Sequence, residues 1–330
     1  MNPACLLATL AVALLLAPLA GAADAEEDTA WGMEARTLDV RGHATGFDFT
    51  STRDSALGAD SITGGFDAPS ARLTTALLTT HPEAASLRID LAWTGLVEYR
   101  DTDGDGLYGL ADETVQPIAV PALPQQTVVT PALGGGDVVA VTYTLPENET
   151  EDPVIGGGLP GTRGTLRLAF TLVPTPAIVD GTLVRPSEVG LDAEVRHFPF
   201  KAGDTRLALV AEVTTDAATL EPADSGVSAA AGRHSWQADW VPQVRVDGGE
   251  SLAGWSSLAS DADRAKAVLS LPRGEAVSQE GSVSAHRMSA AEVVEALRDL
   301  PPGDWRFYAI GLAGAALALG VPSLRRLKER

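Results

Sequence analysis

The sequence predicts a mainly β protein, an antiparallel β-sandwich built as either one large sandwich or two packed ones. From residue 35 onward the dominant spacing of apolar residues is two, the period of strands with one buried face. The 33 glycines and 21 prolines supply turns between such strands. A chain of 330 residues, 45% of them hydrophobic, is long enough to bury one large core or two ordinary ones.

Residues 1–23 are typical of a signal peptide. An apolar run from Leu6 to Leu19 precedes small residues that suit a cleavage site, although only the terminal amine supplies positive charge before the run. Cys5 is the only cysteine of the chain and lies in this segment, so the mature protein is expected to have no disulfide. Residues 24–304 are then expected to form an extracytoplasmic β-sandwich region.

The first strands lead into an acidic segment. Short alternating runs at residues 38–40 and 47–49 are followed by an almost faultless alternation over residues 86–93. In that longer run Arg88 and Asp90 are expected to face water, and four apolar residues to face a core: Leu87, Ile89, Leu91 and Trp93. Gly95 permits a β-bulge, and residues 96–100 continue the strand into the acidic segment.

Residues 101–113 read DTDGDGLYGLADE and predict a calcium site. Aspartates at the first, third and fifth positions and glycine at the sixth follow the spacing of calcium loops, in which alternate carboxylates point at one ion. Gly106 allows the sharp turn, and the seventh position contributes its backbone carbonyl. The expected ligands are Asp101, Asp103, Asp105, Leu107 and Asp112.

The surroundings of this loop argue against an EF-hand, because the preceding residues alternate like a strand and residues 115–117 cannot begin a long helix. The expectation is therefore a structural, strand-flanked Ca²⁺ site of the kind found in extracellular β domains. The alternative is an acidic hairpin tip that binds nothing. Five carboxylates within thirteen residues repel one another without a cation, which favours the calcium site.

Further strands are expected after the loop, at residues 115–120, 127–130, 138–145, 165–172, 189–195, 206–213, 235–240, 244–246 and 267–271. Val139, Val141, Tyr143 and Leu145 share one face of their strand. Residues 146–164 contain five glycines and three prolines, so any subdivision of the β region is expected there. The segment 197–204, HFPFKAGD, is predicted to close a wide hairpin.

The C-terminal end combines a short helix, a membrane span and a basic tail. Residues 289–300 carry a capping box and an amphipathic pattern. Residues 305–324 are predicted to span the membrane, and the basic tail 325–330 places the C-terminus in the cytoplasm. The alternatives for residues 305–324 are a buried helix or a sorting tail removed after export, for which no sortase motif is present.

Composition and motifs exclude several classes of function. Residues 24–306 hold all but one of the 44 acidic residues and all but four of the 24 basic residues. This region therefore carries a large net negative charge, which repels nucleic acid. The five histidines lack metal-ligand spacing, no serine lies in a G-x-S-x-G motif, and the glycine triplets lack phosphate-loop residues. Trp236 and Trp240 share a strand face and are expected in the core rather than on a sugar-binding platform. Asn148 begins a glycosylation sequon.

Three stretches resemble a loosely defined group of uncharacterised, exported archaeal-type surface proteins. These stretches are the strand and loop at residues 96–112, the FPF turn within residues 189–213, and residues 236–248. The resemblance covers about half of the chain and implies a surface-exposed β protein with a C-terminal membrane anchor and no known activity.

Together these features favour a membrane-anchored, extracytoplasmic protein with a structural calcium loop, in a binding, adhesive or envelope role. Its expected partners are the membrane and a surface protein or glycan ligand, without nucleic acid. The alternative is a membrane-anchored hydrolase that acts on envelope polysaccharide or peptide. No catalytic residues are predicted, and the sequence leans against an enzyme.

Overall fold

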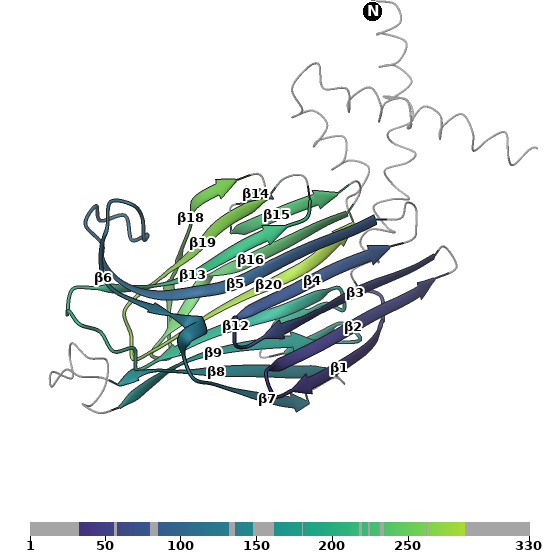
Figure 1. The fold of residues 1–330 in the computed structure, drawn as a ribbon, viewed down its shortest axis with the longest axis horizontal. Helices are drawn as coiled ribbons and strands as arrows, with labels where there is room; N and C mark the ends of the chain where they lie inside the picture. The colour runs from purple at the N-terminus through teal and green to yellow at the C-terminus, as the bar shows by residue number, and fades with distance from the viewer. Residues whose placement is uncertain are drawn as a thin grey trace, which may run out of the picture. The chain divides into compact units, whose positions relative to one another are not determined.

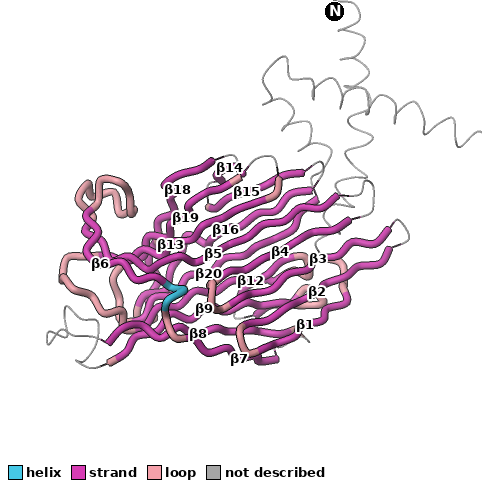
Figure 2. The backbone as a smooth tube through the Cα atoms, viewed as in Figure 1, coloured by secondary structure: helices cyan, strands magenta, loops and turns pink. Residues whose placement is uncertain are grey.

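A computed structural model describes residues 33–55, 58–79, 85–131, 136–147, 162–179, 181–217, 220–223, 225–231, 234–261 and 263–287. These residues are mainly antiparallel β-strands, and the one helical element among them is a short 3₁₀ turn, η1, at Val120–Ala122. Figure 1 shows two large sheets stacked face to face, and Figure 2 shows how little of the described chain lies in loops. The prediction of a mainly antiparallel β fold is confirmed.

The first sheet has nine strands. Eight of them follow the order β1-β2-β3-β4-β5-β13-β19-β18, and β6 pairs with the far end of β5. Their bounds are β1 Thr37–His43, β2 Gly46–Ser55, β3 Gly58–Asp67, β4 Arg72–Thr79, β5 Ala85–Arg100, β6 Glu113–Ala119, β13 Arg206–Thr215, β18 Gly254–Asp261 and β19 Arg264–Leu271.

The second sheet also has nine strands, in the order β14-β15-β16-β20-β12-β9-β8-β7, with β17 paired to β16. A separate two-stranded hairpin, β10–β11, follows β9. The bounds are β7 Gln125–Pro131, β8 Asp137–Glu147, β9 Arg163–Leu172, β10 Ala177–Val179, β11 Thr182–Val184, β12 Glu188–Arg196, β14 Leu220–Ala223, β15 Gly226–Ala231, β16 His234–Val246, β17 Gly249–Leu252 and β20 Ala276–Arg287. Because β8 pairs with β9, the strands on either side of residues 148–161 lie in one sheet.

The two sheets share one hydrophobic core. Phe170 of the second sheet lies among three aromatic rings of the first, with ring centroids 5.3 Å from Phe47, 4.6 Å from Phe66 and 5.9 Å from Trp93. Polar side-chain tips also bridge the sheets, since the Trp236 indole donates a hydrogen bond of 2.9 Å to the carbonyl of Leu87. Aromatic packing of this kind dominates the stability of a sandwich core.

Strand β5 confirms the predicted alternation. Leu87, Ile89, Leu91 and Trp93 are each at most 2% exposed, whereas Arg88 points outward. The predicted bulge is also present: pairing with β13 passes from Gly95 to Trp93 across consecutive β13 residues, so Thr94 is the extra residue. The bulge redirects the end of β5, which continues as far as Arg100 and carries the acidic loop.

The segment 197–204 does not close a hairpin, so that prediction is wrong. Strand β12, before it, pairs with β9 and β20 in the second sheet, whereas β13, after it, pairs with β5 and β19 in the first. The segment is therefore a crossover between sheets. Phe198 and Phe200, each 1% exposed, are buried in the core, so the apolar side chains hold the connection between the layers.

Several predicted features lie outside the described residues. These are the signal peptide 1–23, Asn148, the helix at 289–300, the span 305–324 and the tail 325–330. In the part of the chain that is described, no helix is both long and apolar enough for a membrane span. Membrane placement therefore stays a prediction from the sequence.

Candidate metal site and polar groove

The acidic loop joins β5 to β6. The two strands pair up to Arg100 and Glu113, and the loop between them appears at the left of Figures 1 and 2. Gly104 and Gly106 have φ angles of 78° and 80°, a left-handed conformation that strains residues with a Cβ atom. The sequence therefore places glycine at the two loop positions where the backbone needs it.

Three of the five predicted ligands converge. Asp101, Asp103 and Asp105 each offer a carboxylate oxygen, and these oxygens lie within 4.8 Å of one another. Both oxygens of Asp101 accept backbone N–H groups, from Gly104 at 2.8 Å and Gly106 at 3.0 Å. These bonds orient the carboxylate toward the centre of the loop, and its remaining lone pairs stay available for a cation.

Asp112 links the two halves of the loop through hydrogen bonds. One of its carboxylate oxygens accepts the N–H of Thr102 at 2.9 Å, and the other accepts the N–H of Gly109 at 2.8 Å. Asp112 is not part of the converging group of three. Leu107, whose carbonyl is the fifth predicted ligand, donates its N–H to Asp105 at 2.7 Å.

The loop docks on the outer face of the first sheet. Tyr108 packs with Tyr99 at a ring distance of 5.0 Å, over a small cluster of buried residues that is separate from the main core: Val97, Tyr99, Ala208, Val210 and Val268. The Tyr108 N–H donates to the hydroxyl of Ser270 on β19 at 2.8 Å, and the Tyr99 hydroxyl donates to the carbonyl of Gly106 at 3.1 Å. The conformation of the loop is therefore coupled to the packing of the sheet.

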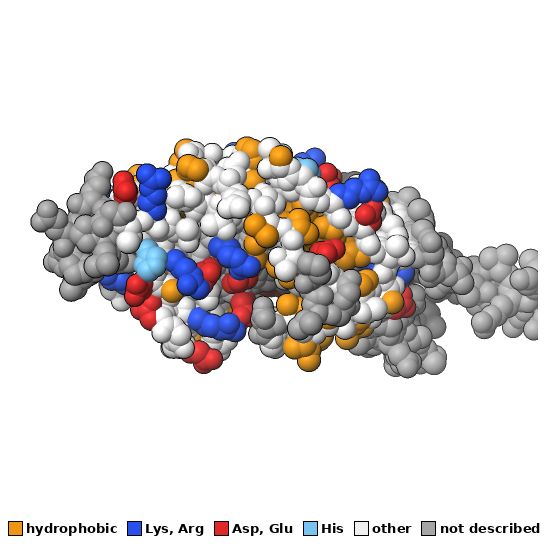
Figure 3. Space-filling view, turned by 90° about the horizontal axis from the view of Figure 1, so that it is seen from below, with side chains coloured by type: hydrophobic (Ala, Val, Ile, Leu, Met, Phe, Trp, Pro, Cys, Tyr) orange, Lys and Arg blue, Asp and Glu red, His pale blue; other side chains and the backbone are white. Residues whose placement is uncertain are grey.

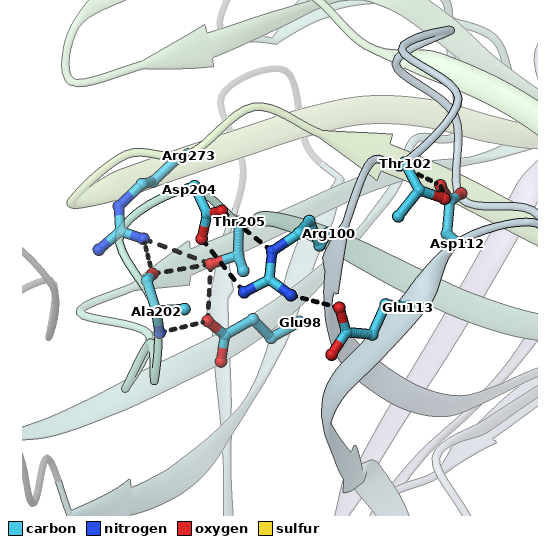
Figure 4. A network of polar contacts seen from close by, with 9 residues as sticks. All are labelled: Glu98, Arg100, Thr102, Asp112, Glu113, Ala202, Asp204, Thr205 and Arg273. Atoms are coloured by element: carbon cyan, nitrogen blue, oxygen red, sulfur yellow. Dashed lines mark hydrogen bonds and ion pairs between the residues drawn. The ribbon is translucent and has the colours of Figure 1, made fainter.

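A buried carboxylate lies close to this loop and was not predicted from the sequence. Glu98 is fully buried, and its oxygens accept the N–H groups of Lys201 and Ala202 and the hydroxyl of Thr205 at 2.6–3.0 Å. Figure 4 shows Glu98 reaching the crossover while Arg100, two residues along the same strand, bridges Glu113 and Asp204.

Arg273 completes this buried network. Its guanidinium stacks 4.1 Å from the centre of the Phe200 ring and donates to the carbonyl of Ala202 at 2.5 Å. Burial lowers the pKa of Arg273, an effect that the nearby Glu98 carboxylate opposes. At the surface, hydrogen bonding to Arg100 lowers the pKa of Asp204. The network fixes the crossover beside the loop.

A polar groove of about 820 Å³ lies on the outer face of the second sheet. Its floor is formed by β9, β12, β20 and β16, with the β10–β11 hairpin on one side and a β16 bulge at Val241 and Pro242 on the other. Two ion pairs lie on the floor: Arg167 with Asp192 at 3.3 Å, and Arg245 with Glu280 at 2.9 Å. Asp192 and Glu280 are directly opposite each other on paired strands.

Burial raises the pKa values of three acidic groups in the groove. Burial on the groove floor raises the pKa of Asp192 to about 6, an effect that Arg167 opposes and Glu194 and Glu280 reinforce. Burial also raises the pKa values of Glu188 and Asp239, which line the same groove. Carboxyl groups with shifted pKa values in a concave site make the groove a candidate binding or catalytic surface.

The raised pKa of Asp192 predicts a pH dependence of stability. Because the folded-state pKa near 6 exceeds the ordinary 3.8, the folded protein binds more protons between these values and loses stability as pH rises from 4 to above 6. Solvent screening reduces the effect, since the side chain is 39% exposed. The asparagine of Asp192→Asn does not titrate. We therefore expect the free energy of unfolding of this variant, relative to that of wild type, to be about 1 kcal/mol higher at pH 7.5 than at pH 4. Urea unfolding at both pH values measures it, and an unchanged difference would contradict the raised pKa.

The tryptophans do not form an exposed sugar platform among the described side chains. Trp236 is fully buried, Trp240 is 5% exposed and Trp93 is 2% exposed, and all three belong to the main core. The prediction of core packing is confirmed for these residues. Figure 3, seen from the edge where β1 and β7 lie, shows acidic and basic side chains interspersed around a more hydrophobic middle.

The fold and the loop together define an antiparallel β-sandwich protein with one converging group of carboxylates among its described residues. Comparison of the sequence with protein families and with characterised proteins finds no match. Among solved structures, the chain is similar to an alpha-mannosidase from Enterococcus faecalis V583, with 7% identity and a TM-score of 0.35. The alignment covers 81% of this chain and 38% of the mannosidase chain, and a likeness at this level is no sign of a shared activity.

Proposed function

We propose that this chain is a cell-surface or periplasm-facing β-sandwich protein, anchored by its C-terminal span, whose acidic loop binds a structural calcium ion. Its role is binding, adhesive or part of the envelope. The observation that carries the proposal is the convergence of Asp101, Asp103 and Asp105 at the spacing of a calcium loop. The predicted signal peptide at residues 1–23 and the apolar C-terminal segment of the sequence support the placement.

The electrostatics of the loop support a bound cation. Three carboxylates within 4.8 Å repel one another, and the guanidinium of Arg206, 4.0 Å from Asp101, balances only part of that charge. Ca²⁺ prefers such oxygen ligands, and sites in extracellular modules have dissociation constants of about 10⁻⁴ to 10⁻³ M. The loop is flanked by strands, so no helix pair beside it can reorient as in a calcium sensor. A structural role follows.

Calcium is expected to stabilise the folded chain. At a hundredfold excess over the dissociation constant, binding contributes about 2.7 kcal/mol, which raises the unfolding midpoint of a domain of this size by about 5 °C. Thermal melts of the full chain in a mild detergent measure the shift between chelator and about 10–100 mM calcium, which is a hundredfold excess over these dissociation constants. The double variant Asp103→Asn, Asp105→Asn is expected to lose it, because asparagine keeps the turn-forming hydrogen bonds and removes the charges.

The matched control is the double variant Asp39→Ala, Asp48→Ala. It removes two exposed carboxylates from the first sheet, whose side chains are 54% and 76% exposed. This control is expected to keep the whole calcium response. An unchanged midpoint of the wild-type chain in calcium would mean that the loop is a solvated hairpin tip.

A second candidate function is a membrane-anchored hydrolase that acts on envelope polysaccharide or peptide. One observation favours it: the carboxyl group of Asp192, with a pKa near 6, faces Glu280 in an open groove, and such carboxyl groups serve as general acids. Reproducible turnover of a saccharide or peptide by the full chain would favour this function over binding alone.

A further inference from the structure

The floor of the groove carries a row of four charged side chains across four neighbouring strands, with two carboxylates in the middle and a guanidinium group at each end. Arg167 on β9, Asp192 on β12, Glu280 on β20 and Arg245 on β16 form two ion pairs side by side. Thr182 on β11 adds a hydrogen bond of 2.8 Å to the second oxygen of Glu280. The row therefore presents fixed donors and fixed acceptors next to one another, all on sheet strands or on the adjoining hairpin.

The charges of the groove select among ligand classes. Five carboxylates and three guanidinium groups line it, so an anionic ligand is repelled. The floor carboxylates Asp192 and Glu280 are already paired with arginines, so a cationic ligand would have to compete with existing partners. A neutral ligand rich in hydroxyl groups meets neither cost, because a hydroxyl donates to a carboxylate and accepts from a guanidinium.

The sides of the groove supply apolar contacts. Val179, Leu183 and Val184 of the β10–β11 hairpin lie on one side, and Val241 and Pro242 of the β16 bulge lie on the other. The bulge is held in place by the buried side chain of Gln279, which donates to the carbonyl of Val241, and by the N–H of Ala253, which donates to the carbonyl of Pro242 at 2.9 Å. A polar floor between apolar sides fits a ligand with hydroxyl edges and C–H faces.

We propose that this groove binds a neutral oligosaccharide, whose hydroxyl groups hydrogen-bond to the Arg167–Asp192 and Arg245–Glu280 pairs while its C–H faces pack against the β10–β11 hairpin and the β16 bulge. The inference deepens the proposed surface role, on which it rests, by naming the ligand class and the site. It does not involve the calcium loop, which lies on the other sheet.

The test uses the full chain in a mild detergent and immobilised oligosaccharides. Neutral hexose and N-acetylhexosamine chains are compared with polygalacturonate, an acidic glycan, and with oligolysine, a basic peptide. Saturable binding of at least one neutral chain is expected, with little retention of either charged probe. Asp192→Asn and Glu280→Gln are each expected to weaken the binding at least tenfold, because each loses a charged acceptor. Thr182→Val, which leaves the ion pairs in place, is expected to weaken it less.

The matched control is Glu212→Gln. Glu212 is as exposed as Asp192, at 39%, and is paired with an arginine at 3.2 Å, but it lies on β13 of the first sheet, away from the groove. It is expected to bind the neutral chain as wild type does. Thermal melts of all variants in the same buffer verify that each is folded.

Three outcomes would overturn the assignment. They are no retention of any neutral chain, retention of polygalacturonate or oligolysine in preference to neutral chains, and equal binding by wild type, Asp192→Asn and Glu280→Gln. A calcium-dependent melting shift without saccharide binding would refute the groove assignment alone. Saccharide binding without a calcium shift would leave the groove assignment standing and remove the calcium site.

Discussion

Glu98→Ala is expected to destabilise the folded chain by about 3–5 kcal/mol, the typical cost of removing one partner from a buried charged network. The substitution leaves the N–H groups of Lys201 and Ala202 without their acceptor. It also removes the carboxylate that opposes the lowering of the Arg273 pKa by burial. The crossover at 197–204 connects the two sheets, so its loosening is expected to weaken the contact between the layers. Urea unfolding monitored by tryptophan fluorescence measures the change.

Glu113→Ala is the matched control for this prediction. Glu113 belongs to the strand paired with β5 and forms an ion pair with Arg100, but its side chain is 58% exposed. An exposed pair of this kind contributes less than about 1 kcal/mol. If Glu98→Ala were as mild as Glu113→Ala, the buried network would have no structural role. Glu98→Gln keeps one acceptor oxygen, so its loss of stability is expected to lie between those of Glu98→Ala and Glu113→Ala.

Asp60→Ala is expected to destabilise the chain by about 3–5 kcal/mol. Asp60 is paired with Arg36, whose side chain is fully buried, and accepts a second hydrogen bond from Arg53 at 2.8 Å. Arg36 further donates to the hydroxyl of Ser51 on β2, and its backbone N–H donates to the carbonyl of Pro174, so Arg36 links the start of the described chain to β2 and to the segment after β9. Burial lowers the pKa of Arg36, an effect that the Asp60 carboxylate opposes.

The double variant Arg36→Met, Asp60→Leu separates charge from packing. Replacing both members of a buried pair by apolar residues is often nearly neutral, so the double variant is expected to be more stable than Asp60→Ala alone. Asp39→Ala, which breaks the exposed pair with Arg41, is the surface control, with an expected loss below about 1 kcal/mol. A loss of that size for Asp60→Ala in urea unfolding would contradict the structural role of the buried pair.

Local pattern was enough to predict many of the strands. The alternation at residues 87–93 and 139–145 reports directly which side chains are buried, because a strand with one covered face repeats every two residues. Gly95 marked the bulge of β5 correctly for a similar local reason, since a glycine within a strand often accompanies an irregularity.

Strand β20 was missed although it lies in the middle of the second sheet. Its sequence, AVSQEGSVSAHR, contains three serines and only two β-branched residues, so it has no strong strand propensity. Pairing with β12 and β16 on its two sides makes it a strand. The hairpin predicted at residues 197–204 failed for a related reason: nearness in sequence suggested pairing, whereas β12 and β13 find their partners in different sheets.

The candidate metal loop could be predicted because its aspartates lie within one turn of chain, where spacing alone brings their carboxylates together. The other features depend on distant residues. Glu98 meets residues 201–205, Asp60 meets Arg36, and the groove gathers side chains from residues 167 to 280. The β class, many strands and the acidic loop could therefore be predicted, because they follow from local periodicity and spacing. The crossover, the buried charge networks and the groove could not, because strand order and sheet packing bring their residues together from distant parts of the chain.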